Sequence, residues 1–318
     1  MNDKVGKVVQ VAVGVLENSL GEILIARRPD HVHQGGLWEF PGGKVDAGET
    51  LNEALRRELW EELAIEVLAT EPLISIRHDY ADKSVLLQVR RVTRFNGDPR
   101  GNEGQPVRWV APWELPQFSF PAANRPIVNA LRLPDQMLVT GPANSPEDWL
   151  ARLDRALDQG VALVQLRCPG LSAEAYAERL SLALPRCRAR GVRLVANAPA
   201  ELWSDDLDGL HLNSRALAEC RERPVPESAW LGASCHNEGE LRRACELGAD
   251  YVTLSPVSAT GSHPDAEPMG WETFGQLAAQ AGIPVYAQGG MKPVDLVRVK
   301  QAGGRGIAGI SFGWPTGL

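Results

Sequence analysis

The segment that decides the fold of the first half of the chain reads GKVDAGE at residues 43–49 and, after seven intervening residues, RELWEELAI at residues 57–65. A helix over about residues 50–63 places Glu58, Glu61 and Glu62 on one side, because these residues are three and four positions apart. Like charges so placed destabilise a bare helix by about 0.2–0.5 kcal/mol per pair. A divalent cation reverses that penalty, and Mg²⁺ prefers oxygen ligands. The segment predicts a helix that carries a Mg²⁺ site, with a solvated acidic face as the alternative.

The residues around this helix fit a metal site. Glu49 precedes the helix, where we expect its carboxylate to hold the guanidinium of Arg57. Gly42 and Gly43 permit a tight turn that brings a backbone oxygen close to the metal.

The spacing resembles the Nudix box, in which Gly, five residues, Glu and seven residues precede Arg-Glu-apolar-x-Glu-Glu-x-Gly-apolar. The chain departs from that pattern at Ala64, where the box has glycine. Alanine resists positive φ, so we expect the end of the helix to differ from the family's cap. Every metal-ligand position is kept, so we expect activity to be kept as well.

The resemblance extends over residues 10–131, which are similar to the MutT-type 8-oxo-dGTP pyrophosphatases. The matching stretches are Val11–Gly14, Ala26–Arg28, Trp38–Gly43, Glu103–Pro106 and Phe120–Pro126. The resemblance implies an α+β Nudix fold, an α/β/α sandwich with a mixed sheet. It also implies a Mg²⁺-dependent reaction, with Mn²⁺ as a substitute, that cuts a nucleoside triphosphate into a monophosphate and pyrophosphate.

The resemblance also implies roles for individual residues. It gives as metal ligands the Gly43 carbonyl, Glu58, Glu61, Glu62 and Glu103. It gives as catalytic groups Glu58, Glu61 and Glu103. It gives as substrate contacts Arg28, Phe40 and Asn124, of which Asn124 reads the purine base. Each of four residues has a plainer alternative: a surface arginine for Arg28, core packing for Phe40, a solvated loop acid for Glu103 and a helix N-cap for Asn124.

The length of 318 residues suggests two domains. We place them at residues 1–133 and 134–318, on either side of a polar hinge at residues 132–136. Besides the acidic helix, we expect strands in the first half at Val8–Leu16, Ile23–Ala26, Ile74–Tyr80, Val85–Phe95 and near Val107, with a hairpin turn at residues 81–84. A second helix is expected at Asn124–Leu131. The segment at residues 34–43, between the second of these strands and the acidic helix, is rich in Gly and Pro.

The second half alternates short apolar runs with amphipathic stretches. Eight runs are strand candidates: Met137–Thr140, Ala162–Arg167, Arg193–Asn197, Gly209–Leu212, Trp230–Ser234, Tyr251–Ser255, Pro284–Gln288 and Gly306–Ile310. Repeated βα units imply a parallel sheet, and eight of them predict an α/β TIM-type (β/α)8 barrel.

This half resembles the thiamine-phosphate synthase and TenI family. The motifs that match are Gln165–Arg167, Asp208–Leu212, Gly232–His236, Leu247–Val252, Gln288–Met291 and Ala302–Ala308. Relative to the synthases, Pro169 replaces a lysine, Ala198 replaces a metal-binding aspartate, and the run at residues 213–216 has no acidic residue. Synthase chemistry needs Mg²⁺ to neutralise a departing pyrophosphate, so we expect this activity to be lost.

The same resemblance points to a small-molecule site in the barrel. Gly289 and Gly290 lie where this fold presents backbone N–H groups to a phosphate, with Ser311 as a further contact. His236 matches the acid/base candidate for thiazole tautomerisation in the TenI branch. The alternative is that His236 only hydrogen-bonds at the barrel rim. The expected ligand is a thiazole phosphate or another small phosphate.

Composition narrows the class of protein. Charged residues make up 23%, and the net charge of −7 divides into −2 up to Leu133 and −5 beyond it. Neither half has the basic excess that wraps a nucleic-acid polymer. No apolar run approaches the ~20 residues of a membrane span. The five cysteines show no C-x-x-C spacing, so a reducing cytoplasm is expected.

Three functions remain open at this point. The first is a hydrolase that removes oxidised guanine nucleotides, converting 8-oxo-dGTP to 8-oxo-dGMP and pyrophosphate. The second is a Nudix hydrolase of thiamine-related pyrophosphates, with a tautomerase barrel. The third is a barrel that only senses or binds a thiazole phosphate. Asn124 is the main residue that favours the first over the second.

Overall fold

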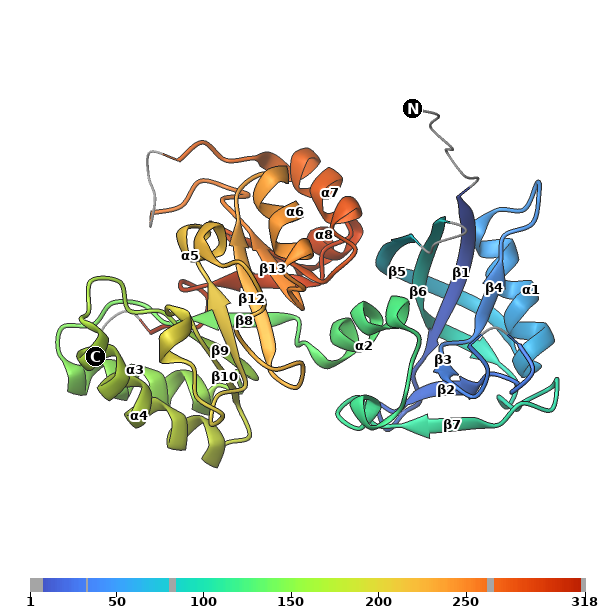
Figure 1. Ribbon diagram of the computed structural model, residues 1–318, viewed down its shortest axis with the longest axis horizontal. Coiled ribbons are helices and arrows are strands. Elements are labelled where there is room, and N and C mark those ends of the chain that lie inside the picture. The colour runs from blue at the N-terminus through green and yellow to red at the C-terminus, as the bar shows by residue number, and fades with distance from the viewer. Residues whose placement is uncertain (1–7, 33, 80–83, 262–265, 316–318) are drawn as a thin grey trace. The chain divides into compact units, whose positions relative to one another are not determined.

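The computed structural model describes residues 8–32, 34–79, 84–261 and 266–315 (Figure 1). The chain forms two compact units, residues 1–132 and residues 133–318. The expected hairpin turn at residues 81–83 and Tyr80 lie outside the described residues.

The first unit contains a mixed four-stranded sheet and an antiparallel three-stranded sheet. The four-stranded sheet has the order β4 (Gly42–Lys44), β1 (Val9–Leu16), β6 (Ser84–Asn96) and β5 (Glu66–Asp79). Strands β1 and β6 are parallel, and the other pairs are antiparallel. The three-stranded sheet has the order β3 (Trp38–Glu39), β2 (Ile23–Arg27) and β7 (Val107–Val110). Strand β3 lies within the segment at residues 34–43 that is rich in Gly and Pro, and β4 begins at its end; we predicted neither strand from the sequence.

Two helices cover opposite faces of these strands: α1 (Leu51–Leu63) and α2 (Arg125–Arg132) (Figure 1). Side chains alternate along β1, so Ala12 and Leu16 pack with α1 whereas Val13 and Val15 pack with α2. Between them Gly14 lies under Leu59, where a Cβ would come within 2.8 Å of a leucine methyl group. The expected α/β/α sandwich with a mixed sheet is confirmed. Short 3-10 helices η1 (Leu115–Gln117) and η2 (Ala122–Asn124) precede α2.

Helix α1 begins at a capping box in which the side chains of Thr50 and Glu53 each accept a hydrogen bond from the other's backbone N–H. It ends at Ala64, which has φ 55° and ψ 39° and donates its N–H to the Trp60 carbonyl at 3.0 Å. We expected alanine to give a different cap, and that expectation is wrong. The chain must turn after Leu63 because Ile65 is fully buried in the core beneath α1, so Ala64 takes the left-handed conformation.

The second unit is a closed barrel of eight parallel strands, with the strand order β10-β11-β12-β13-β14-β15-β8-β9. Its strands are β8 (Gln136–Val139), β9 (Leu163–Leu166), β10 (Arg193–Ala196), β11 (Gly209–Leu212), β12 (Trp230–Cys235), β13 (Tyr251–Leu254), β14 (Val285–Gln288) and β15 (Gly306–Gly309). All eight predicted strands are confirmed. The helices are α3 (Pro146–Asp158), α4 (Ala173–Ala189), η3 (Ala200–Leu202), α5 (Ser214–Glu219), α6 (Glu238–Glu246), α7 (Gly270–Ala281), η4 (Pro293–Asp295) and α8 (Leu296–Gln301).

Large side chains fill the interior of the barrel. Tyr251 and Tyr286 are fully buried there, with ring centroids 5.9 Å apart in an edge-to-face arrangement. The interior of the barrel is therefore packed with side chains, and a binding site is expected at the carboxyl ends of the strands. Within the described residues, no helix is both long enough and apolar enough to cross a membrane.

The left-handed Ala64 gives a stability prediction. We expect Ala64→Gly to raise the free energy of unfolding by about 0.5–1 kcal/mol, because glycine has no Cβ penalty in this conformation. The matched control is Ala54→Gly in the middle of α1, which should lower stability by about 1 kcal/mol or more. Urea unfolding of both variants checks this, and equal destabilisation by the two substitutions would contradict the assigned cap.

Candidate active sites

The acidic side of α1 lies against the glycine turn of β4. The Gly42 N–H donates to Oε2 of Glu62 at 3.0 Å. A Cβ at Gly43 would lie 2.2 Å from the carboxyl carbon of Glu58. Only glycine therefore lets the backbone come this close to the carboxylates.

Four carboxylates influence one another at this point. Burial raises the pKa of Glu62 to about 8, the Gly42 hydrogen bond opposes the shift, and the charges of Glu39, Glu58 and Glu103 raise it further. Glu39 was not singled out from the sequence, although it lies only four residues before Gly43, because the pattern of the box does not include it. The neighbouring negative charges favour the protonated form of the Glu62 carboxyl. The same cluster of negative charges suits a bound cation.

The guanidinium of Arg57 contacts the carboxylates at this side of α1. Its Nε and Nη2 donate to the two carboxylate oxygens of Glu49 at 2.8 and 3.0 Å, which confirms the predicted pair. Its Nη1 also donates to Glu58 at 2.8 Å and reaches Glu61 at 3.4 Å. In the part of the chain that the structure describes, no three acidic, histidine or cysteine side chains are arranged to chelate a metal ion as they stand. Glu58 and Glu61 share the guanidinium instead.

The predicted nucleotide contacts lie beside this group. Arg28 forms an ion pair with Glu39. Burial raises the pKa of Glu39, against the opposing effect of Arg28. Phe40 is buried and stacks on Phe120 with a centroid distance of 5.4 Å and an interplanar angle of 12°, so its side chain is at least a packing residue.

Asn124 does not cap α2. It is the last residue of η2, which runs directly into α2 through Arg125 at φ −54° and ψ −44°. An N-cap needs an extended backbone, so the geometry contradicts that alternative. Among the residues that the structure describes, the Asn124 side chain has no hydrogen-bond partner, which leaves both its donor and its acceptor available to a ligand.

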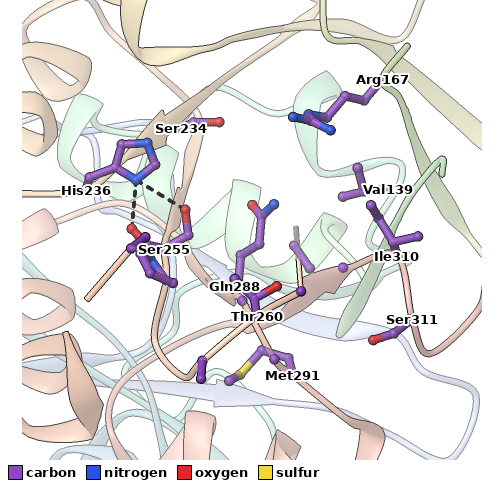
Figure 2. Close-up of a pocket in the computed structure, with 18 of the residues that line it drawn as sticks. Val139, Arg167, Ser234, His236, Ser255, Thr260, Gln288, Met291, Ile310 and Ser311 are labelled. Carbon is purple, nitrogen blue, oxygen red and sulfur yellow. Dashed lines mark hydrogen bonds between the residues drawn. The ribbon is translucent and has the colours of Figure 1, made fainter. Parts of the chain in front are cut away.

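The barrel has a cleft of about 1300 Å³ at the carboxyl ends of its strands (Figure 2). Gly289 and Gly290 have φ of 92° and 68°, and a Cβ at Gly290 would lie 2.5 Å from the Ala259 carbonyl. The turn therefore requires glycine at this position. Ser311, which we expected beside the turn, also lines the cleft (Figure 2).

His236 lies at the edge of the same cleft. Its Nδ1 is 2.7 Å from the Ser255 carbonyl, which can only accept a hydrogen bond (Figure 2). In the neutral ring Nδ1 therefore carries the proton and Nε2 has a free lone pair. This tautomer suits a group that takes up a proton.

The cleft differs from a Mg²⁺-pyrophosphate site. Arg167 points into it (Figure 2), and its guanidinium has no carboxylate partner among the described residues. Ala198 is buried at the position where the resemblance places an acid, and the Asn213 side chain caps α5 by accepting from the Ala216 N–H at 2.9 Å. The charged side chains that line the described cleft include the cations Arg167 and Lys292, and Glu267 is the one carboxylate among them, a balance that suits an anion.

A buried hydrogen-bond chain that we did not foresee ends at this cleft. His211 is fully buried and contacts the Tyr251 hydroxyl at 3.2 Å and the Ser234 hydroxyl at 2.9 Å. Burial lowers the pKa of His211 to about 3, so the ring is neutral at physiological pH. Within the described residues the Tyr251 hydroxyl has no other acceptor, so it donates to Nδ1, and Nε2 then donates to Ser234. Ser234 is left with its own hydrogen free for a ligand.

The comparisons with known proteins agree with the two units. A family model described as "NUDIX domain" matches residues 12–130, and one described as "Thiamine monophosphate synthase" matches residues 136–312. The 8-oxo-dGTP diphosphatase of Escherichia coli K12 is 37% identical over 126 residues, which cover 40% of this chain and 98% of that protein.

Two further relatives are similar to the chain, one to each unit. The CTP pyrophosphohydrolase of Escherichia coli K12 is 36% identical over 124 residues, which cover 39% of this chain and 91% of that protein. The thiamine-phosphate synthase of Geobacillus kaustophilus is 37% identical over 180 residues, which cover 54% of this chain and 81% of that protein.

Proposed function

The chain belongs to the Nudix family through its first unit and to the thiamine monophosphate synthase family through its second; from this we propose that it is a Mg²⁺-dependent hydrolase that converts 8-oxo-dGTP to 8-oxo-dGMP and pyrophosphate. The observation that carries the proposal is the half-buried Glu62 beside three other carboxylates on and around α1.

The residues of the first unit fit the metal that the family implies. Glu58, Glu61, Glu62 and Glu103, with the Gly43 carbonyl, would hold Mg²⁺, and Mn²⁺ would substitute. The bound metal supplies the positive charge that stabilises attack by water at a phosphorus of the triphosphate. Glu58, Glu61 and Glu103 are the candidates for positioning that water or accepting its proton. Arg28 is placed to contact a phosphate once it is released from Glu39.

The base specificity is assigned to Asn124. Oxidised guanine differs from guanine in its pattern of donors and acceptors, and an amide can match one pattern and leave the other unpaired. The support is the unpartnered amide of Asn124, close in sequence to Phe120, which stacks on Phe40.

For the barrel we propose a phosphate-binding site without synthase activity. Arg167 and the turn at Gly289 and Gly290 support binding of a thiazole phosphate or another small phosphate. The acidic and lysine side chains that would serve a Mg²⁺-pyrophosphate are replaced. Any proton transfer would use Nε2 of His236.

The metal site gives the first functional prediction. Glu62→Gln and Glu58→Gln should each lower turnover by about 10²–10⁴-fold, while the fold survives because like-charge repulsion is removed. Oε1 of glutamine can still accept the Gly42 N–H, so Glu62→Gln is a conservative change. Turnover is measured with Mg²⁺ and with EDTA, alongside circular dichroism. Full activity in either variant, or in EDTA, would rule out the proposed metal site.

A substrate panel tests the proposed reaction. The full chain with Mg²⁺ is expected to prefer 8-oxo-dGTP over dGTP, CTP and thiamine diphosphate. Asn124→Ala should reduce the preference for 8-oxo-dGTP over dGTP by roughly five- to 150-fold, which corresponds to the loss of about 1–3 kcal/mol of hydrogen bonding. A preference for thiamine diphosphate would support the second function that the sequence left open. An unchanged ratio in the variant would remove Asn124 from base recognition.

The barrel gives a separate prediction. The full chain should not restore growth to a strain that lacks thiamine-phosphate synthase, yet calorimetry in EDTA should detect binding of thiazole phosphate. Gly290→Ala should weaken that binding, because its Cβ would collide with the Ala259 carbonyl. Complementation would overturn the loss of synthase chemistry, and the absence of binding would indicate a purely structural barrel.

A further inference from the structure

A loop that carries Glu103 is tied to the last turn of α1. The Arg100 N–H donates to the Leu63 carbonyl at 3.2 Å, and the Asn102 N–H donates to the Glu62 carbonyl at 2.9 Å. The Asn102 side-chain amide donates to the Glu61 carbonyl at 2.9 Å. The carbonyls of a final helical turn have no partners within the helix, so they are natural acceptors for such a loop.

Gln105 makes the most specific of these contacts. Its Nε2 donates to the Glu62 carbonyl at 2.9 Å, and its Oε1 accepts from the Glu103 N–H at 2.9 Å. One carboxamide therefore bridges the backbones of two proposed metal ligands on different elements. The Glu62 carbonyl receives two donors, from Gln105 and Asn102, which uses both of its lone pairs.

Within the residues that the structure describes, the Glu103 side chain makes no contact that would position it. In the described part of the chain, the Glu103 carboxylate has no hydrogen bond or ion pair. The Gly104 N–H donates to the Gly101 carbonyl at 3.1 Å, and a Cβ at Gly101 would lie 1.8 Å from the Gln105 carbonyl, so the loop closes tightly on itself. The position of the Glu103 backbone thus depends on this closure and on the Gln105 bridge.

We propose that Gln105 is a positioning residue of the hydrolase site, which holds the Glu103 carboxylate at the acidic side of α1 by bridging the Glu103 N–H and the Glu62 carbonyl. The inference rests on the proposed metal-dependent function and names a residue to which no role has been assigned. The carboxamide of Gln105 has a donor on one atom and an acceptor on the other, as this bridge requires. Glutamate keeps the acceptor and loses the donor, and methionine keeps the shape and loses both.

The test compares Gln105→Met and Gln105→Glu with Glu103→Gln in the full chain. The matched control is Gln117→Met at the end of η1, where the glutamine is exposed and, among the described residues, makes only a backbone hydrogen bond. Binding of Mn²⁺ is followed by electron paramagnetic resonance without nucleotide, and kcat and KM are measured with 8-oxo-dGTP. Hydrogen exchange reports the protection of the Glu103 amide.

We expect Gln105→Met to weaken Mn²⁺ binding by about tenfold or more, as is typical when a partner that orients a metal ligand is lost. Its Mn²⁺ affinity should approach that of Glu103→Gln. Protection of the Glu103 amide should fall, kcat should fall more than KM rises, and Gln105→Glu should be at least as impaired. Gln117→Met should match the wild type. Unchanged Mn²⁺ affinity and unchanged exchange in Gln105→Met would overturn the inference. A wild-type chain that binds Mn²⁺ but prefers another pyrophosphate would contradict the proposed substrate and leave the bridge intact.

Discussion

Mutual repulsion among the carboxylates that surround the half-buried Glu62 is the constraint on which the first unit depends. Glu58 and Glu62 come from α1, Glu39 from β3 and Glu103 from a loop, so three elements must fold together to create the group. Several contacts offset its cost: the Gly42 N–H on Glu62, the guanidinium of Arg57 on Glu58, and the ion pair of Arg28 with Glu39. A bound divalent cation would reduce the repulsion that remains among the carboxylates. The free energy of unfolding of the first unit would then depend on the metal ion that the proposed reaction uses.

The sites proposed for the two units differ in polarity, although a phosphate compound is the proposed ligand of each. In the first, carboxylates would recruit a metal that neutralises a triphosphate. In the second, Arg167 and a glycine turn face the cleft directly, and the Tyr251–His211–Ser234 chain adds a fixed hydrogen-bond donor. A cleft of the second kind suits an anion that needs no metal. Ala198, and the absence of an acidic residue at residues 213–216, are consistent with this difference.

Local sequence patterns predicted much of this molecule. Helix α1, the pair of Glu49 with Arg57 and all eight barrel strands follow from periodicity and spacing within short windows. The features that were missed depend on contacts between distant segments. Strands β3 and β4 form because β2 and β1 pair with them, and Ala64 turns left-handed because Ile65 is buried. The approach of Glu39 to Glu62, and the Gln105 bridge, are tertiary contacts that no local pattern encodes.

Calorimetric unfolding of the full chain, with and without Mg²⁺, tests the central claim most directly, since it needs no substrate. If the carboxylates around Glu62 are held at a cost that a cation relieves, saturating Mg²⁺ should raise the Tm of the first unit by several degrees and leave the barrel transition in place. A free-energy gain of about 2.7 kcal/mol is expected at a hundredfold excess over Kd. Identical transitions of the first unit in Mg²⁺ and in EDTA would contradict the account.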